Sequence, residues 1–122
     1  MANERTSVIN IAGKDYELVL TTKATREIND KFGGLENIGN KIAEAKGVGE
    51  QLDIVVWLIT LLANQSILRS NLESGEKKPL LKEEDVEILT SPADLNSYTE
   101  AILDCLVKGT KRNVQSEGDS KN

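Results

Sequence analysis

An alternating pattern of apolar and polar residues opens the chain, in the stretch VINIAGKDYELVL (residues 8–20). The apolar positions of this pattern are Ile9, Ile11, Tyr16, Leu18 and Leu20. A period of two buries one face of a strand, and the intervening AGKD is a turn in which glycine can adopt a positive φ. The sequence therefore predicts a β-hairpin, which must pack on helices because a lone hairpin is marginal in water.

Helical spacing replaces the alternation after the hairpin. Thr21 or Thr22 can cap a helix by accepting a hydrogen bond from a free backbone N–H. Ala24, Ile28 and Phe32 then recur at every fourth position, which places them on one face. The sequence therefore predicts an amphipathic helix that begins at a threonine cap and ends with Phe32.

A double glycine, Gly33 and Gly34, follows this helix directly. Gly33 suits the left-handed position that ends many helices, and Phe32 can then fold back to fill the angle between two helices. A phosphate-binding loop would need GxGxxG, or GxxxxGK before Ser or Thr, after a strand. A helix-turn-helix would make LENIGNKIAEAK the recognition helix, which lacks the Arg, Gln and Ser residues that usually contact base edges. We therefore interpret Phe32, Gly33 and Gly34 as structural.

Two further helices follow the glycines. A short one runs from about Leu35 to Lys46 and ends at Gly47, where GVG forms a flexible joint. A long one covers about residues 50–73 and is apolar on nearly all sides, which is typical of a helix buried in a core or against a partner. Its first apolar stripe consists of Leu52, Val55, Val56, Ile59, Leu62, Ala63 and Ile67. Its second apolar stripe consists of Ile54, Trp57, Leu58, Leu61 and Leu68.

A short acidic helix is predicted after the polar break SGEKKP, in the stretch LLKEEDVEIL (residues 80–89). Leu81, Val86 and Leu89 are its expected apolar contacts. Its acidic residues are Glu83, Glu84, Asp85 and Glu87. They lack the spaced oxygen ligands of a calcium loop and have no partner group nearby in the sequence. A solvated helix face is therefore favoured over a metal or acid–base site.

The last predicted helix has a strong N-terminal signal. Ser91 is an N-cap residue, Pro92 suits the first helical position, and Asp94 stands where a capping-box acid helps. Gly109 is expected to stop this helix. Residues 110–122, TKRNVQSEGDSKN, are polar, which predicts a disordered tail that the fold does not need.

These elements predict a mainly α (α+β) fold, in which an N-terminal β-hairpin is followed by four to five helices. The chain has 122 residues, which favours one compact domain, here residues 1–109. Aromatic residues make up only 3% of the chain, so the core must be aliphatic.

Composition excludes several classes of function. The chain has no histidine, which removes the commonest general base and most zinc sites. Its single cysteine, Cys105, lies among apolar residues and is interpreted as a small buried hydrophobic residue. A net charge of −5 disfavours nucleic acid as a partner. We therefore expect no catalytic, cofactor or metal sites. We also expect an intracellular protein, because neither a secretion signal nor an apolar run of about 20 residues is present.

The stretch GKDYELVLTTKATREINDKFGGLENIGNKI resembles the front of the small tail assembly chaperones of long-tailed bacteriophages and related prophages. The resemblance is sharpest from Leu20 to Ile42 and covers most of the chain up to about Gly109. Family members are similar in having a short hairpin, a Thr-capped helix ending in KFGG followed by Leu, a second short helix, a long apolar helix, an acidic helix and a last helix.

The resemblance implies a non-enzymatic role in the host bacterial cytoplasm, with no catalytic residues to carry across. Such chaperones bind the long, helical tape-measure protein and help tail-tube subunits gather around it. Many are made in two lengths by a ribosomal frameshift, and this chain resembles the short form, with its polar end where an extension would begin.

Alternatives remain open at this point. The protein could be a structural tail-completion or connector protein that is retained in the virion, or a small DNA-binding regulator. The second stripe of the long helix, around Trp57, could be ordinary core, a surface for self-association or the client-binding surface. An enzyme is the least expected class.

Overall fold

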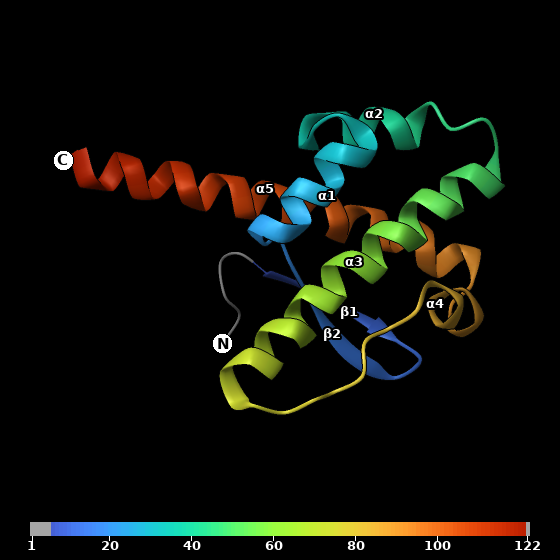
Figure 1. Ribbon diagram of the computed structural model, residues 1–122. Helices are drawn as coiled ribbons and strands as arrows, with labels where there is room; N and C mark the ends of the chain where they lie inside the picture. The colour runs from blue at the N-terminus through green and yellow to red at the C-terminus, as the bar shows by residue number, and fades with distance from the viewer. Residues whose placement is uncertain (1–5, 122) are drawn as a thin grey trace.

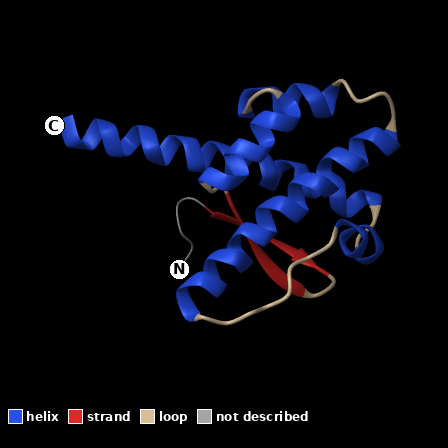
Figure 2. Cartoon of the chain, in the orientation of Figure 1, coloured by secondary structure: helices blue, strands red, loops and turns tan. Residues whose placement is uncertain are grey.

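The structure, a computed structural model, describes the backbone of residues 6–121 and the side chains of residues 7–110. Its elements in chain order are β1 (Thr6–Ile11), β2 (Lys14–Val19), α1 (Thr22–Phe32), the 3₁₀ turn η1 (Leu35–Asn37), α2 (Ile38–Ala43), α3 (Val48–Ser74), α4 (Glu83–Leu89) and α5 (Pro92–Lys121). The fold is 70% helical with one antiparallel hairpin, which confirms the predicted fold class. Strand β2 packs against α3 and strand β1 against α5 (Figures 1 and 2).

The hairpin turn is tighter than predicted. Ile11 pairs with Lys14 across the two strands, so the turn contains only Ala12 and Gly13. Both residues have positive φ, 52° and 87°, which is the backbone of a two-residue turn that matches the twist of paired strands. Lys14 and Asp15, predicted to lie in the turn, therefore belong to β2.

Both ends of α1 follow the sequence prediction. Thr21 is the N-cap, and its Oγ1 accepts a hydrogen bond from the N–H of Ala24 at 3.0 Å. The same hydroxyl donates to Oε1 of Gln65 on α3 at 2.6 Å. Gly33 ends the helix with φ of 86°, and its N–H donates to the carbonyl of Asn29 at 2.8 Å. The cap at Thr21 and the left-handed conformation predicted for Gly33 are confirmed.

The helix predicted from Leu35 to Lys46 is shorter than expected. The chain first makes the 3₁₀ turn η1, because Nδ2 of Asn37 reaches back to the carbonyl of Phe32 at 3.1 Å. At the other end, Nε2 of Gln51 donates to the carbonyl of Ile42 at 3.3 Å. The same carbonyl accepts a second bond from the N–H of Ala45 at 3.4 Å, so it is bonded although α2 ends at Ala43.

Two of the three residues of the predicted flexible joint at GVG belong to α3, and Gly47 is the N-cap of that helix. The helix already includes Val48 and Gly49. Oε1 of Glu50 accepts a bond from the N–H of Lys46 at 3.4 Å, which closes the N-terminal end of α3. An acid in the first turn also interacts favourably with the helix dipole.

Helix α4 contributes less to the core than the sequence predicts. Val86 is fully buried and Leu81 is half-buried just before the helix. Leu89, an expected apolar contact and the last residue of α4, is 47% exposed although its spacing places it on the same side as Val86. The prediction for Leu89 is therefore wrong.

Helix α5 begins as predicted but does not end at Gly109. The N–H of Asp94 donates to Oγ of Ser91 at 3.3 Å, and the N–H of Ser91 donates to Oδ2 of Asp94 at 3.0 Å, which confirms the capping box. Gly109 is buried within the helix, where it lies against Leu20. The glycine permits a close crossing instead of a stop, and the helix extends away from the body to Lys121 (Figure 1). Side chains of the predicted tail beyond residue 110, and residue 122, lie outside the described part, as do residues 1–5.

The core is aliphatic, as predicted, and lies between the hairpin and the helices. Its fully or nearly fully buried apolar residues include Ile9, Ile11, Leu18, Ile28, Ile38, Val55, Leu58, Ile59, Leu62, Val86, Ile102 and Cys105. Half of these residues come from α3 and α5, and the rest come from the hairpin, α1, α2 and α4.

Candidate functional site

The outer face of α3 carries a row of half-buried apolar side chains, which we call the outer stripe: Ile54, Trp57, Leu61 and Leu68. Their separations of three, four and seven residues place them on one side of the helix. Ile54, Trp57 and Leu61 pack against the edge of the core while remaining partly accessible. Leu58, which the sequence grouped with them, is fully buried and does not belong to this surface.

An aromatic pair stands at the N-terminal part of the outer stripe. The rings of Phe32 and Trp57 meet edge to face, with centroids 5.6 Å apart and planes at 82°. Nζ of Lys31 lies 5.1 Å from the Trp57 centroid and 5.8 Å from the Phe32 centroid. The turn at the double glycine ends α1 where Phe32 can reach α3. The sequence analysis expected Phe32 between α1 and the next helix and missed Trp57, because the contact joins distant segments.

An extended segment is hydrogen-bonded to the C-terminal half of α3. We call residues 76–82 the strap, which returns along α3 toward α4 (Figure 1). Asn64 donates to the carbonyl of Leu81 at 2.9 Å and accepts from its N–H at 2.7 Å. Asn71 donates to the carbonyl of Lys78 at 3.1 Å and accepts from its N–H at 3.0 Å. The sequence signal for this arrangement is a pair of asparagines seven residues apart on an otherwise apolar helix face.

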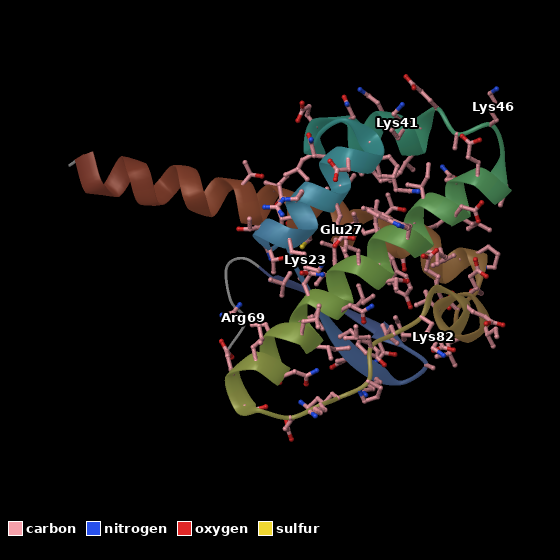
Figure 3. All side chains as sticks on the ribbon, viewed as in Figure 1. Lys23, Glu27, Lys41, Lys46, Arg69 and Lys82 are labelled. Carbon is pink, nitrogen blue, oxygen red and sulfur yellow. The ribbon has the colours of Figure 1, made fainter. Side chains whose placement is uncertain are left out.

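Basic side chains stand around the same face. Figure 3 looks onto the side of α3 turned away from the hairpin and shows Lys23 with Glu27, Arg69 and Lys82 near α3, whereas Lys41 lies farther away on α2. Lys23 pairs with Glu27 at 2.9 Å, and their side chains are 66% and 40% exposed. Arg69 pairs with Glu73 at 3.4 Å, so two of these cations have carboxylate partners.

A second apolar surface lies where α5 leaves the body. It is an open groove of about 590 Å³ between α1, the double-glycine turn and α5. Its apolar lining comes from Leu35, Leu106 and Val107, and Val107 is 58% exposed. Nothing in the sequence pattern predicted this groove, because it forms between three separate elements.

The polar groups of α5 tie it to the hairpin. The Tyr98 hydroxyl donates to the carbonyl of Asn10 at 2.5 Å, and the Ser7 hydroxyl donates to Oδ2 of Asp104 at 2.7 Å. The hydrogen bond from Ser7 and the neighbouring Lys108 hold the pKa of Asp104 below its ordinary value. Burial raises the pKa of Tyr98. The Tyr98–Asn10 and Ser7–Asp104 hydrogen bonds therefore both join α5 to strand β1.

The described residues offer little reactive chemistry. Among them, no group of three His, Cys, Asp or Glu side chains could hold a metal ion. Burial raises the pKa of the Cys105 thiol to about 12, so it stays protonated at neutral pH. The predicted acidic cluster of α4 is exposed.

Helix α3 is long and apolar enough to cross a membrane by length and composition alone, with 18 residues of mean hydropathy 1.5. A core helix of a soluble protein passes the same test. In this fold α3 contacts the hairpin, α4 and α5, which is the position of a core helix.

The structure brings the outer stripe together with Phe32 and Lys31, and it removes Leu58 from the predicted partner-binding set. No protein-family model, curated protein or solved structure matches the chain. The functional argument therefore proceeds from this surface and from the sequence resemblance.

Proposed function

We propose that this protein is a tail assembly chaperone of a long-tailed bacteriophage or prophage, acting without enzymatic chemistry in the bacterial cytoplasm. Its client is the tape-measure protein, with the tail-tube protein as a further partner. The observation that carries the proposal is the outer stripe, where Trp57 remains partly accessible beside Phe32.

The outer stripe has the properties of a surface that receives a helix. Large aromatic side chains supply most of the binding energy in many interfaces, and Trp57 is the largest partly accessible side chain on α3. A straight row of apolar residues along a helix matches the i, i+3, i+4, i+7 pattern of an amphipathic partner helix. A long, helical tape-measure protein presents many such segments, so several copies can bind one client with weak single contacts.

The charge around the stripe favours acidic positions flanking the apolar face of the client helix. Lys31 stands over the aromatic pair, and Lys23 and Lys82 lie at the edges of the same face. Exposed charges of this kind guide association and are screened by salt. Binding should therefore weaken as the salt concentration rises, while the apolar contact persists.

The test is co-expression with the tape-measure protein. We expect a long, helix-rich reading frame downstream of this gene to encode that protein. The wild-type chain should co-purify with this protein and keep it soluble, and Trp57→Ala should lose most of the binding while still melting cooperatively. Ile88→Ala is the matched control, because Ile88 is 72% exposed on α4 and lies outside the outer stripe. Equal binding by both variants would refute the assignment of the surface.

The main alternative, a structural tail-completion or connector protein, makes a different prediction about the finished particle. A chaperone should be absent from purified virions by mass spectrometry, whereas a structural component should be present in fixed copy number. Detection of the chain in the virion would therefore overturn the chaperone proposal.

A further inference from the structure

Strand β1 pairs with β2 along one edge, and within the described residues no strand occupies its other, outer edge. The two-residue turn makes Ile11 and Lys14 a hydrogen-bonded pair. In an antiparallel ladder such pairs alternate with pairs whose backbone groups point away from the partner strand. Val8 lies three positions before Ile11 and faces Glu17, so the N–H and carbonyl of Val8 point outward.

Asn10 confirms the direction of this edge. Its carbonyl, two residues after Val8 and therefore on the same edge, accepts the hydrogen bond from the Tyr98 hydroxyl on α5. Among residues 7–110, no side chain or loop bonds to the backbone of Val8 from that side, and Val8 is 51% exposed. An extended backbone complements such an edge, because one residue of an added strand exchanges both bonds with Val8.

An open hollow of about 530 Å³ lies beside Val8, and we call it the β1–α5 trough. One wall is β1 at Ser7 and Val8. The other wall is a row on one side of α5, made of Ser97, Glu100, Ala101, Asp104 and Lys108. Eleven residues of helix advance by about 16 Å, which is the length of about five extended residues. The trough therefore has the length of a short strand.

The two walls determine which side chains an added strand would present. Side chains alternate between the two faces of a sheet, so the residue opposite Val8 would share the outer face with Val8. Its two neighbours would point to the opposite face. That is the face of Ser7, whose hydroxyl donates to Oδ2 of Asp104 at 2.7 Å. An apolar residue therefore suits the position opposite Val8, and its neighbours meet the α5 row.

The α5 row favours a basic neighbour. Asp104 pairs with Lys108 at 3.1 Å, whereas exposed Glu100 has no ion pair among the described residues. A lysine or arginine in the added strand would supply the missing cation, and the net charge of −5 also favours a basic partner. A second copy of the chain fits less well. Its β1, TSVINI, has no charged residue, and its β2 carries Asp15 and Glu17.

We infer that the β1–α5 trough binds a short extended segment of a partner protein, which pairs with Val8 as a third strand. The segment has a β-branched apolar residue opposite Val8 and a lysine or arginine that faces Glu100. The trough shares no residue with the outer stripe. This inference therefore goes beyond the proposed function and does not depend on it.

The test titrates the isotopically labelled full chain with a capped peptide, TKVKT, and follows the backbone amides by NMR. The Val8 amide should move downfield, and its hydrogen exchange should slow by about tenfold at saturation, because it gains an acceptor. A Kd of about 1 mM is expected for so few contacts, rising with salt concentration. The same peptide N-methylated at its valine is the matched control. It lacks the donor to the Val8 carbonyl and should bind at least about tenfold more weakly.

Val8→Pro removes the outward N–H and keeps the bonds to β2, since an edge strand tolerates a proline whose N–H would face solvent. It should fold and bind the peptide at least about tenfold more weakly, whereas Val8→Thr keeps the N–H and should bind like the wild type. Glu100→Lys leaves the backbone edge intact and should weaken binding by about threefold or more. This variant and the N-methylated peptide keep the test decisive if Val8→Pro folds poorly.

Absence of any amide shift at millimolar peptide would overturn the inference, as would equal binding of the N-methylated peptide. Equal binding by Glu100→Lys would overturn the basic character of the partner. Shifts confined to α3 around Trp57 would place the peptide on the outer stripe and would also overturn the inference. Self-association of the chain that Val8→Pro abolishes would assign the edge to a second copy instead of a partner protein.

Discussion

Gly109 of α5 lies directly against Leu20 at the end of the hairpin: a Cβ on Gly109 would stand 2.8 Å from Cδ2 and 2.9 Å from Cβ of Leu20. The second of these atoms is next to the backbone and cannot turn away. The glycine therefore lets helix and hairpin approach more closely than any other residue would permit. A position that looked like a helix stop is in fact a packing contact within the helix.

Gly109→Ala should consequently lower the free energy of unfolding by about 1–3 kcal/mol, despite the better helix propensity of alanine. Chemical denaturation with an unchanged m value would measure the loss. Gly39→Ala in α2 is the control, because a Cβ there meets nothing within 4 Å. That variant should be neutral or stabilised by up to about 1 kcal/mol. A stabilised Gly109→Ala variant would contradict the packing contact.

Gly33→Val should destabilise the fold by about 1 kcal/mol or more, because a β-branched residue resists the φ of 86° at this helix end. The added Cβ would also stand 3.2 Å from Nδ2 of Asn37. Thermal melting compares this variant with Gly33→Asn, which tolerates the left-handed region and should lose less. Equal melting temperatures for the two variants would argue against a conformational role for Gly33.

The contact between Phe32 and Trp57 should appear as a coupling energy. In a double-mutant cycle, Phe32→Ala and Trp57→Ala should together cost about 0.5–1.5 kcal/mol less than the sum of the single losses. The measurement is denaturant unfolding of the four proteins. Phe32→Ala combined with Ile88→Ala supplies the control and should be additive, since Ile88 is exposed on a different helix.

Cys105 should be unreactive toward thiol reagents in the folded protein at pH 8 and react fully in denaturant. Its pKa is raised from 9.0 to about 12 in the fold, mainly by burial. Between pH 9 and about 12 the unfolded thiol loses its proton while the folded thiol keeps it. Deprotonation stabilises the unfolded state, so the free energy of unfolding falls as pH rises above about 9. Cys105→Ala should show a smaller fall over the same pH range. Rapid modification of the native protein would show that the thiol is accessible.

Removal of residues 110–122 should leave the melting temperature nearly unchanged. This segment contains one large apolar residue, Val114, and α5 extends away from the body here (Figure 1). Deletion of residues 101–122 is the contrasting variant. It removes the buried Ile102 and Cys105 and should abolish cooperative folding. A large loss of stability on removing residues 110–122 alone would mean that they dock on the domain.

Local signals were sufficient for much of this fold. The hairpin followed from a period of two, and the caps at Thr21 and Ser91 followed from side chains that bond their own helix N-termini. Gly33 followed from the need for a left-handed residue after an amphipathic helix. In each case the decisive contact joins residues within a few positions of each other, so the chain carries the information locally. The chaperone role and its tape-measure client are proposals that rest on the sequence resemblance and on the outer stripe.

Contacts between distant segments were decided only by the tertiary structure. The sequence marks α3 as apolar all round, but only packing buries Leu58 and leaves Trp57 partly accessible. Asn64 and Asn71 resemble ordinary polar interruptions until the strap folds back onto them. Gly109 reads as a stop because its partner, Leu20, lies far away in the chain. The physical reason is common to all three: a residue's own type and neighbours set its local conformation, whereas the helix crossing determines which surface it meets.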